Sequence, residues 1–255
     1  MNEISLIDML KAGVHFGHQQ SRRHPKMEPY IFTTRGGVSI LNLEKTRAAL
    51  NQALTFIHDL TARGGTIILV GTKRQAKEVI QEVAQLAGMP YVTDRWIGGL
   101  FTNFANVRQL SQKLHRLKEE RASGSRAKYT KKEQFEFDTE IERLEQLVGG
   151  VANMDKLPDA VFITDVRQEK NAIHEAKKMK IPVVAICDTN VNPTGIAYCI
   201  PANDDATKSL HLITSAVAEA ISAGRRDGDA ALAAAAKTAA DSAAAATVAV
   251  EAHQE

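Results

Sequence analysis

The sequence lacks an apolar run approaching the roughly 20 residues that a membrane-spanning helix needs. Residues 1–6 also lack the cationic start and the apolar core of a signal peptide. Its only cysteines, Cys187 and Cys199, both stand in apolar surroundings, so a disulfide framework is not expected. We therefore expect a cytoplasmic chain with reduced thiols and no membrane span.

The usual signatures of enzymes are missing as well. No strand-like run is followed by a Walker loop, which needs a second glycine before Lys-Ser/Thr, or by a Gly-x-Gly-x-x-Gly fingerprint. There is no Gly-x-Ser-x-Gly elbow and no His-Glu-x-x-His helix. One stretch nevertheless supports an enzyme as the alternative function, because residues 71–74, Gly-Thr-Lys-Arg, directly follow an apolar run. The alternative is a nucleotide-dependent enzyme on a Rossmann-like sheet.

Charge is nearly balanced, with a net charge of +2, but it is distributed unevenly along the chain. Residues 226–255 carry a net charge of −3, which leaves +5 for residues 1–225. A mildly basic body permits binding to a nucleic acid without requiring it, because clustering of cations matters more than their total.

Apolar runs without polar alternation occupy residues 66–70, 160–164 and 183–187, with weaker runs at 91–93 and 195–200. Such runs are typical of strands buried on both faces of a parallel sheet. Helical patterns separate them, and a glycine pair between residues 30–34 and 38–41 predicts a hairpin. The alternation predicts an α/β fold with a doubly wound parallel sheet.

Residues 106–148 interrupt this alternation with two apolar seams at heptad spacing. They predict an inserted antiparallel helical hairpin, a projecting coiled coil, although two ordinary amphipathic helices lying on the sheet remain the alternative. We therefore divide the chain into an α/β domain of residues 1–105 and 149–225, the inserted hairpin, and an alanine-rich tail of residues 226–255. The tail has few bulky side chains to bury, so we expect it to be mobile.

Histidines and carboxylates follow several of the predicted elements. His15, His18 and His24 lie in an early loop, and Asp188, Asp204 and Asp205 follow later strands. Loops at one edge of a sheet can converge, and imidazole with carboxylate suits zinc. The first two histidines and the three aspartates are thus a candidate site for a zinc or magnesium ion, while solvated or hydrogen-bonded histidines are the alternative. No other cofactor is expected.

Cations cluster at the ends of the predicted elements, where they can face one extended polyanion. Trp96 and Phe101 are aromatic side chains available for packing or for stacking on bases. Each run of charged residues, taken singly, predicts only a solvated surface. Taken together, the runs favour RNA over a small substrate as the ligand. The cations are Arg22, Arg23, Lys26, Arg35, Lys73, Arg74, Arg95, Arg126, Lys128, Lys131 and Lys132.

A series of motifs follows in order over about residues 4–225: residues 9–18, 41–46, 70–73, 95–99, 102–103, 157–160, 200–201 and 203–205. Together these motifs resemble one family, that of the bacterial small-subunit ribosomal protein S-two. The alanine-rich tail lies outside the resemblance.

The resemblance implies a non-enzymatic ribosomal component with a flavodoxin-like sheet and a protruding coiled coil. It implies binding to small-subunit ribosomal RNA near the junction of head and body, contacts with neighbouring small-subunit proteins, and help in docking the messenger-binding ribosomal protein S-one. An independent homo-oligomer is not expected. Trp96 and Asn103, from the matching motifs, join these cations in the predicted RNA-binding set, which leaves out Arg126 and Lys128 near the tip of the helical hairpin.

Overall fold

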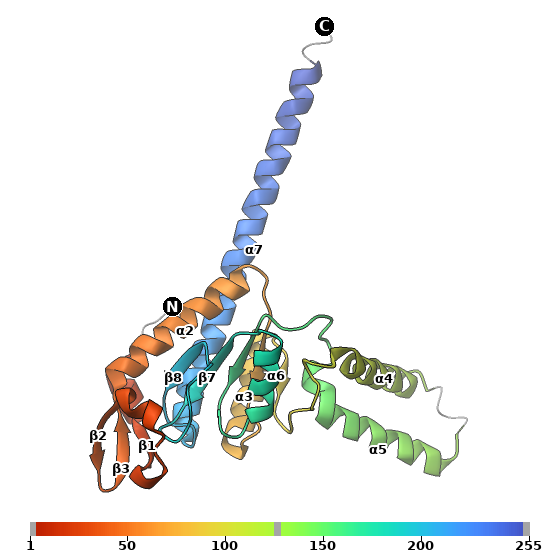
Figure 1. Cartoon of the computed structure of the whole chain (residues 1–255). Coiled ribbons are helices and arrows are strands. Elements are labelled where there is room, and N and C mark those ends of the chain that lie inside the picture. Colours follow the sequence, from red (N-terminus) through yellow and green to blue (C-terminus); the bar gives the residue numbers. More distant parts are fainter. Residues whose placement is uncertain (1–3, 125–128, 252–255) are drawn as a thin grey trace.

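The computed structural model describes residues 4–124 and 129–251, and its centre is a five-stranded parallel sheet. The strand order is β5-β4-β6-β7-β8, which is the flavodoxin-like order 2-1-3-4-5. The prediction of a doubly wound parallel sheet is confirmed (Figure 1). The strands are β4 (Ile67–Val70), β5 (Tyr91–Val92), β6 (Ala160–Ile163), β7 (Val183–Cys187) and β8 (Tyr198–Pro201).

Helices cover both faces of this sheet, which explains why its strands lack polar alternation. Ile67 and Leu69 pack into one core cluster with α2 (Leu43–Ala62), α3 (Arg74–Ala87) and α7 (Thr207–Glu251). Ile68 and Val70 point the other way, into a second cluster that includes α6 (Lys170–Lys178). All four residues of β4 are fully buried.

A small antiparallel sheet stands beside the main one, in the order β1-β3-β2. The predicted hairpin is confirmed as β2 (Ile31–Arg35) and β3 (Val38–Leu41), joined by Gly36 and Gly37, which both have positive φ. The early histidine-rich loop contains β1 (Phe16–Gln19), which we did not expect; it forms because it pairs with β3. Around it lie α1 (Leu6–Lys11) and two short 3-10 helices, Gln20–Arg22 and Pro25–Tyr30.

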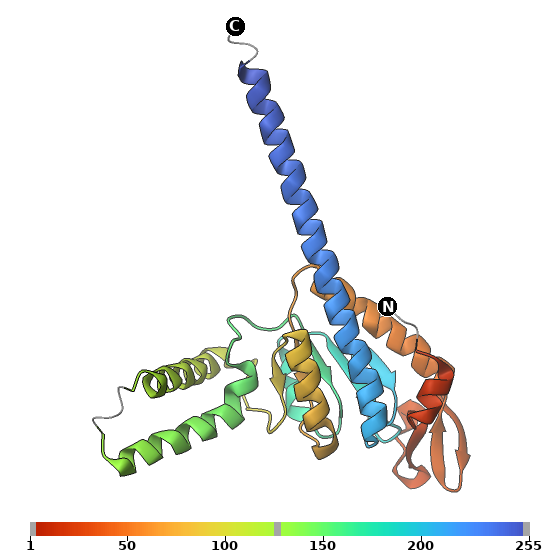
Figure 2. The ribbon, with the colours of Figure 1, turned by 180° about the vertical axis from the view of Figure 1, so that it is seen from behind.

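The predicted helical hairpin consists of α4 (Phe104–Ala122) and α5 (Lys131–Val148). Both predicted apolar seams lie between the helices, where Leu114 and Leu144 are fully buried, and a Lys113–Glu140 ion pair of 2.6 Å links them. The two helices run side by side away from the sheet, as Figures 1 and 2 show from opposite sides. This arrangement favours a helical hairpin over two helices lying flat on the sheet, while the coiled coil itself stays a prediction.

The last helix, α7, is longer than the sequence predicted. The α/β domain was predicted to end at residue 225, but this helix continues to Glu251. A side chain at Gly224 would overlap the carbonyl of His58, and one at Gly228 would overlap the carbonyl of Ala62, so α2 and α7 touch through bare backbone. Packing thus holds the first turn of the predicted tail; mobility beyond it stays a prediction, and residues 252–255 lie outside the described part.

Candidate nucleic-acid interface

The carboxyl ends of the parallel strands meet at one edge of the sheet, where open α/β folds bind their ligands. Four loops with polar side chains converge there: residues 71–73 after β4, 164–169 after β6, 188–197 after β7 and 202–206 after β8. The histidine-bearing strand β1 lies against the same edge, because the backbone amide of His18 donates a 2.9 Å hydrogen bond to Thr189 Oγ1.

Lys73 lies in the middle of this edge and is surrounded by carboxylates. Its Nζ is 2.6 Å from Asp205 Oδ1, 3.0 Å from Asp204 Oδ1 and 3.2 Å from Asp165 Oδ2. Burial alone would lower the pKa of this ammonium, but the hydrogen bonds and charges of the three aspartates outweigh it and raise the pKa above its ordinary value. Lys73 was predicted to contact RNA; in the folded chain its charge neutralises aspartates of the chain itself.

Asp204 is the carboxyl group whose pKa this arrangement changes most, because three carboxylates share one ammonium. Burial, reinforced by the charges of Asp165 and Asp188, raises its pKa to about 7, even though Lys73 opposes the shift. The raised pKa of Lys73 and the part of the Asp204 shift that comes from neighbouring charges share one cause, which is the gathering of several carboxylates around one half-buried ammonium.

His18 closes the other side of the edge. Its Nδ1 lies 3.0 Å from Asp188 Oδ2, and its Nε2 lies 3.5 Å from Asp205 Oδ2. The hydrogen bond to Asp188 raises the pKa of the imidazole above its ordinary value, despite the opposing effect of burial.

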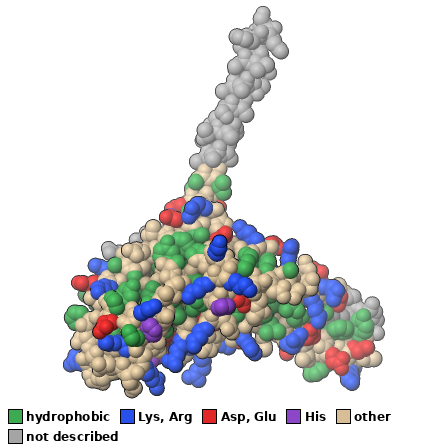
Figure 3. All heavy atoms as spheres, viewed as in Figure 1, with side chains coloured by type: hydrophobic (Ala, Val, Ile, Leu, Met, Phe, Trp, Pro, Cys, Tyr) green, Lys and Arg blue, Asp and Glu red, His purple; other side chains and the backbone are tan. Residues whose placement is uncertain are grey.

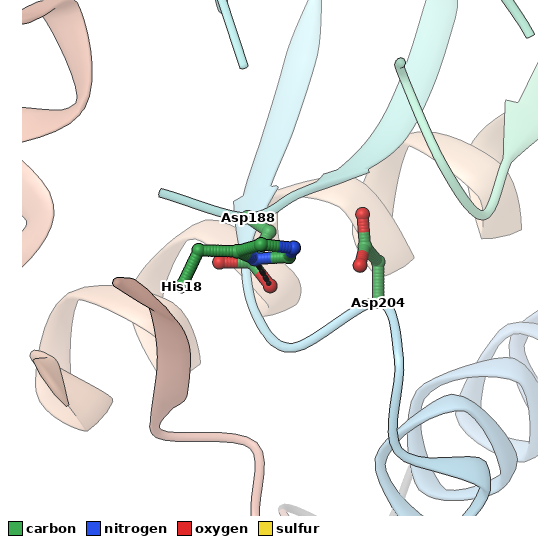
Figure 4. A group of neighbouring side chains, drawn as sticks. All are labelled: His18, Asp188 and Asp204. Carbon is green, nitrogen blue, oxygen red and sulfur yellow. Dashed lines mark ion pairs between the residues drawn. The ribbon is translucent and has the colours of Figure 1, made fainter. Parts of the chain in front are cut away.

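Figure 4 shows His18, Asp188 and Asp204 around a common point, with one donor atom from each lying within 4.8 Å of the others. A zinc ion with bonds of 2.0–2.1 Å holds its donors roughly 3.3 Å apart, so this group fits after a small contraction. The imidazole favours zinc over magnesium, which prefers oxygen ligands. Lys73 already bonds to Asp204, so a metal ion would have to share that carboxylate with it.

The remaining predicted metal ligands lie differently. Asp205 lies beside the group, where it contacts His18 Nε2 and shares Lys73 with Asp204, and its side chain is half exposed. His15 is not part of the group: its Nδ1 is buried without a hydrogen-bond partner in the described structure, and its ring packs against Phe16 at 4.0 Å between centroids. His24 Nδ1 instead accepts a hydrogen bond from the amide of Lys26 at the start of a 3-10 helix.

Trp96 and Phe101 form part of the core, with Trp96 only 6% exposed. The indole Nε1 of Trp96 donates a 3.0 Å hydrogen bond to Glu175 Oε1. Glu175, on α6, also accepts hydrogen bonds from Gly99, Phe101 and Thr102. Buried in this way, Trp96 has no face free for stacking on a base, so of the two predicted roles the structure favours packing.

Over residues 9–224 the sequence matches the family described as Ribosomal protein S2. The chain belongs to this family. Curated relatives named "Small ribosomal subunit protein uS2" come from Geotalea uraniireducens, 47% identical over 221 residues (87% of this chain, 86% of the relative), and from two Psychrobacter species. The proteins of P. cryohalolentis and P. arcticus are each 47% identical over 223 residues, which cover 88% of this chain and 84% of theirs.

Membership of the S2 family gives the chain a structural role in the small ribosomal subunit, and hence in translation. The family match ends at residue 224, close to the point where the alanine-rich tail begins. Within the described residues, no helix is both long and apolar enough to cross a membrane.

The predicted RNA-contacting residues of this S2-family chain are mostly exposed, and they are distributed over several elements of the chain. Three members are not exposed: Trp96 is buried, Lys73 is half-buried among its aspartates, and Arg23 is half-buried in a 3.1 Å ion pair with Glu28. Lys26 Nζ donates a 2.7 Å hydrogen bond to Thr194 Oγ1. Arg126 and Lys128 lie outside the described residues. The exposed members are Arg22, Lys26, Arg35, Arg74, Arg95, Asn103, Lys131 and Lys132.

Three further basic side chains of this S2-family protein were not among the predicted RNA-contacting residues. Arg167, Lys170 and Lys177 line a cleft together with Arg22, on the α6 side of the sheet. Their positions, with His174 between them, are spaced by 3, 4 and 3 residues. A search for polar as well as apolar seams at helical spacing would have found this basic stripe.

Proposed function

We propose that this chain binds small-subunit ribosomal RNA through the exposed basic side chains at the ends of its elements. The observation that carries the proposal is their placement at strand ends, turns and helix starts: Arg35 at the β2–β3 turn, Arg74 at the start of α3, and Lys131 at the start of α5. Arginine and lysine at such positions can contact phosphates of a folded RNA without rearranging the sheet. Ribosome association in the cytoplasm follows from the same role.

We also propose that the chain helps to dock the messenger-binding ribosomal protein S-one and contacts neighbouring small-subunit proteins. Support comes from large apolar side chains exposed on the N-terminal elements: Ile7 and Leu10 on α1, Phe16 on β1, and Phe32 on β2. The strands β1 and β2 are the two edges of the small sheet. Exposed apolar side chains beside an unpaired strand edge favour a protein partner over RNA.

Sucrose-gradient sedimentation tests both parts. We expect the chain to sediment with the small subunit, and particles depleted of it to carry less S-one. A Phe32→Ser variant, which removes the most exposed side chain of this surface, should keep the chain on the particle while reducing bound S-one. Leu86→Ser, at an equally exposed position on α3, is the control. A chain that stays in the unbound fraction contradicts RNA binding, and unchanged S-one on depleted particles contradicts docking.

The alternative of a nucleotide-dependent enzyme is disfavoured by the charge of the sheet edge. The loop of residues 71–74 presents a lysine that three carboxylates already engage, and Glu169 accepts a 3.0 Å hydrogen bond from the amide of Thr72. A phosphate at this loop would face these carboxylates, and like charges at short range repel. Calorimetry with common nucleotides is expected to give no binding signal.

The acidic edge also supports the proposal that His18, Asp188 and Asp204 hold one zinc ion. We expect the purified, metal-stripped chain to bind one equivalent of zinc in a calorimetric titration. His18→Asn should weaken that binding by more than about tenfold, since loss of a ligand exceeds the effect of losing an outer partner. The control is His211→Gln, which alters an exposed histidine on α7. Equal zinc affinity in both variants would place the ion elsewhere.

A further inference from the structure

The β7–β8 loop, residues 188–197, divides the carboxyl edge of the sheet into two parts of opposite charge. On one side Asp188 faces His18, next to the other aspartates. On the other side Asn190, Asn192 and Thr194 line the cleft with the missed basic residues. The β6–α6 loop is divided likewise, since Asp165 contacts Lys73 while Arg167 lines the cleft.

The charged side chains that line the cleft are all basic. Its volume is about 830 Å³, and its lining includes Arg22, Arg167, Lys170 and Lys177 but no aspartate or glutamate. In the described structure no ion pair joins any of these four cations to a carboxylate. Figure 3 shows Lys and Arg side chains gathered over this face of the molecule. Four uncompensated cations around one hollow attract a polyanion strongly.

The floor of the cleft is apolar where Val166, Ile173 and Val191 line it. Cations at the rim with an apolar floor suit a chain of alternating phosphates and sugar-base units, because phosphates can meet the rim while a ribose or base covers the floor. An acidic peptide could pair its carboxylates with the cations at the rim. It would cover the apolar floor only if it also carried apolar side chains at suitable positions. The acidic edge beyond the β7–β8 loop repels phosphates, so it favours passage of the strand through the cleft.

We propose that the cleft between α6 and the β7–β8 loop binds a sugar-phosphate strand of RNA, with Arg22, Arg167, Lys170 and Lys177 on its phosphates. This inference rests on the proposed RNA-binding function and names the part of the surface that carries it. Lys177 is already directed at the loop, since its Nζ donates a 3.0 Å hydrogen bond to the carbonyl of Thr194. Arg167 and Lys170 are exposed, so the pair can be replaced without disturbing the core.

The test measures affinity of the full chain for small-subunit ribosomal RNA over a range of salt concentrations. The double variant Arg167→Gln/Lys170→Gln should bind roughly tenfold more weakly. It should also make the negative slope of log affinity against log salt shallower, by roughly 1.5. The control Lys11→Gln/Lys208→Gln removes two exposed lysines outside the cleft and should change neither quantity. If the wild-type chain fails to bind RNA, the proposed function is wrong. If it binds and the two double variants match it, only the cleft inference is overturned.

Lysine acetylation of the wild-type complex gives a second measurement that needs no variant. Bound RNA should protect Lys170 and Lys177 from acetylation and leave Lys208 reactive. Equal reactivity of the three lysines with and without RNA overturns the inference. Polyglutamate serves as the probe for an acidic protein partner: protection by polyglutamate but not by RNA would assign the cleft to a protein and overturn it too.

Discussion

Replacing Glu175 by alanine should lower the free energy of unfolding by roughly 3–5 kcal/mol, because it leaves several buried donors without an acceptor. The carboxylate is 7% exposed. Its Oε1 accepts from Trp96 Nε1 at 3.0 Å and from the amide of Gly99 at 2.8 Å. Its Oε2 accepts from the amides of Phe101 and Thr102 at 3.0 and 3.2 Å and from the hydroxyl of Thr102. One side chain thereby fixes the segment that leads into α4.

The ionised state of Glu175 also stabilises the fold. Burial alone would raise its pKa, but the hydrogen bonds from Trp96 and the three amides outweigh this effect and lower the pKa below its ordinary value. A carboxyl with a depressed pKa in the folded state contributes stability above its unfolded pKa and loses it as the pH falls through the folded value. The difference between wild type and Glu175→Ala should therefore shrink in acid.

Chemical denaturation followed by tryptophan fluorescence is a direct measurement, since Trp96 is the only tryptophan. Glu175→Gln keeps the shape but presents an amide NH₂ to donors, so it should be nearly as destabilising as alanine. Glu142→Ala, at an exposed glutamate on α5, should change stability by about 0.5 kcal/mol or less. If Glu175→Gln were as stable as wild type, the hydrogen bonds would not be what holds this segment.

The sheet could be predicted because its signal is local. A strand covered on both faces needs apolar side chains at successive positions, and β4, β6 and β7 each show this in four or five adjacent residues. The helices α4 and α5 could be predicted for the same reason, because the apolar seam of each one repeats within its own sequence. The strand β1 was not, because its pairing with β3 lies outside its own sequence.

The candidate site could be predicted only in its residue types. His18, Asp188 and Asp204 were chosen because loops after parallel strands converge, and the structure brings these three together. The pairing of charges within the chain could not be predicted from the sequence. Lys73 was assigned to RNA, but its ammonium donates a hydrogen bond to Asp204, which lies 131 positions away and leaves no local signal around Lys73. The contact of Trp96 with Glu175 spans 79 positions and was hidden in the same way.

The internal role of Lys73 leads to the second large expected effect. Lys73→Met should lower the free energy of unfolding by roughly 3 kcal/mol or more at pH 8, because removing one partner leaves buried carboxylates uncompensated. Asp204 is 2% exposed and Asp165 7% exposed, so water cannot replace the lost ammonium there. Lys77→Met is the control: its 2.8 Å pair with Asp94 is more exposed, and its loss should cost about 1 kcal/mol or less.

The effect of Lys73→Met should depend on pH with a definite sign. The pKa of Asp204 is already about 7 with the lysine present, and loss of the lysine removes an influence that lowers it. Between the unfolded pKa of an aspartate, about 3.9, and this raised folded value, the folded chain binds more protons than the unfolded chain. Stability therefore falls as pH rises through that window. The deficit of the variant against wild type should be small near pH 5 and large near pH 8.

Denaturation curves at several pH values, recorded with a chelator so that no metal ion substitutes for the ammonium, measure this deficit. Adding Asp204→Asn to Lys73→Met removes the uncompensated charge and should restore much of the stability at pH 8. A deficit that does not vary with pH, or that the second substitution fails to reduce, contradicts an internal role. If Lys73→Met instead folded as stably as Lys77→Met but bound RNA more weakly, the lysine would belong to the RNA interface, as the sequence alone suggested.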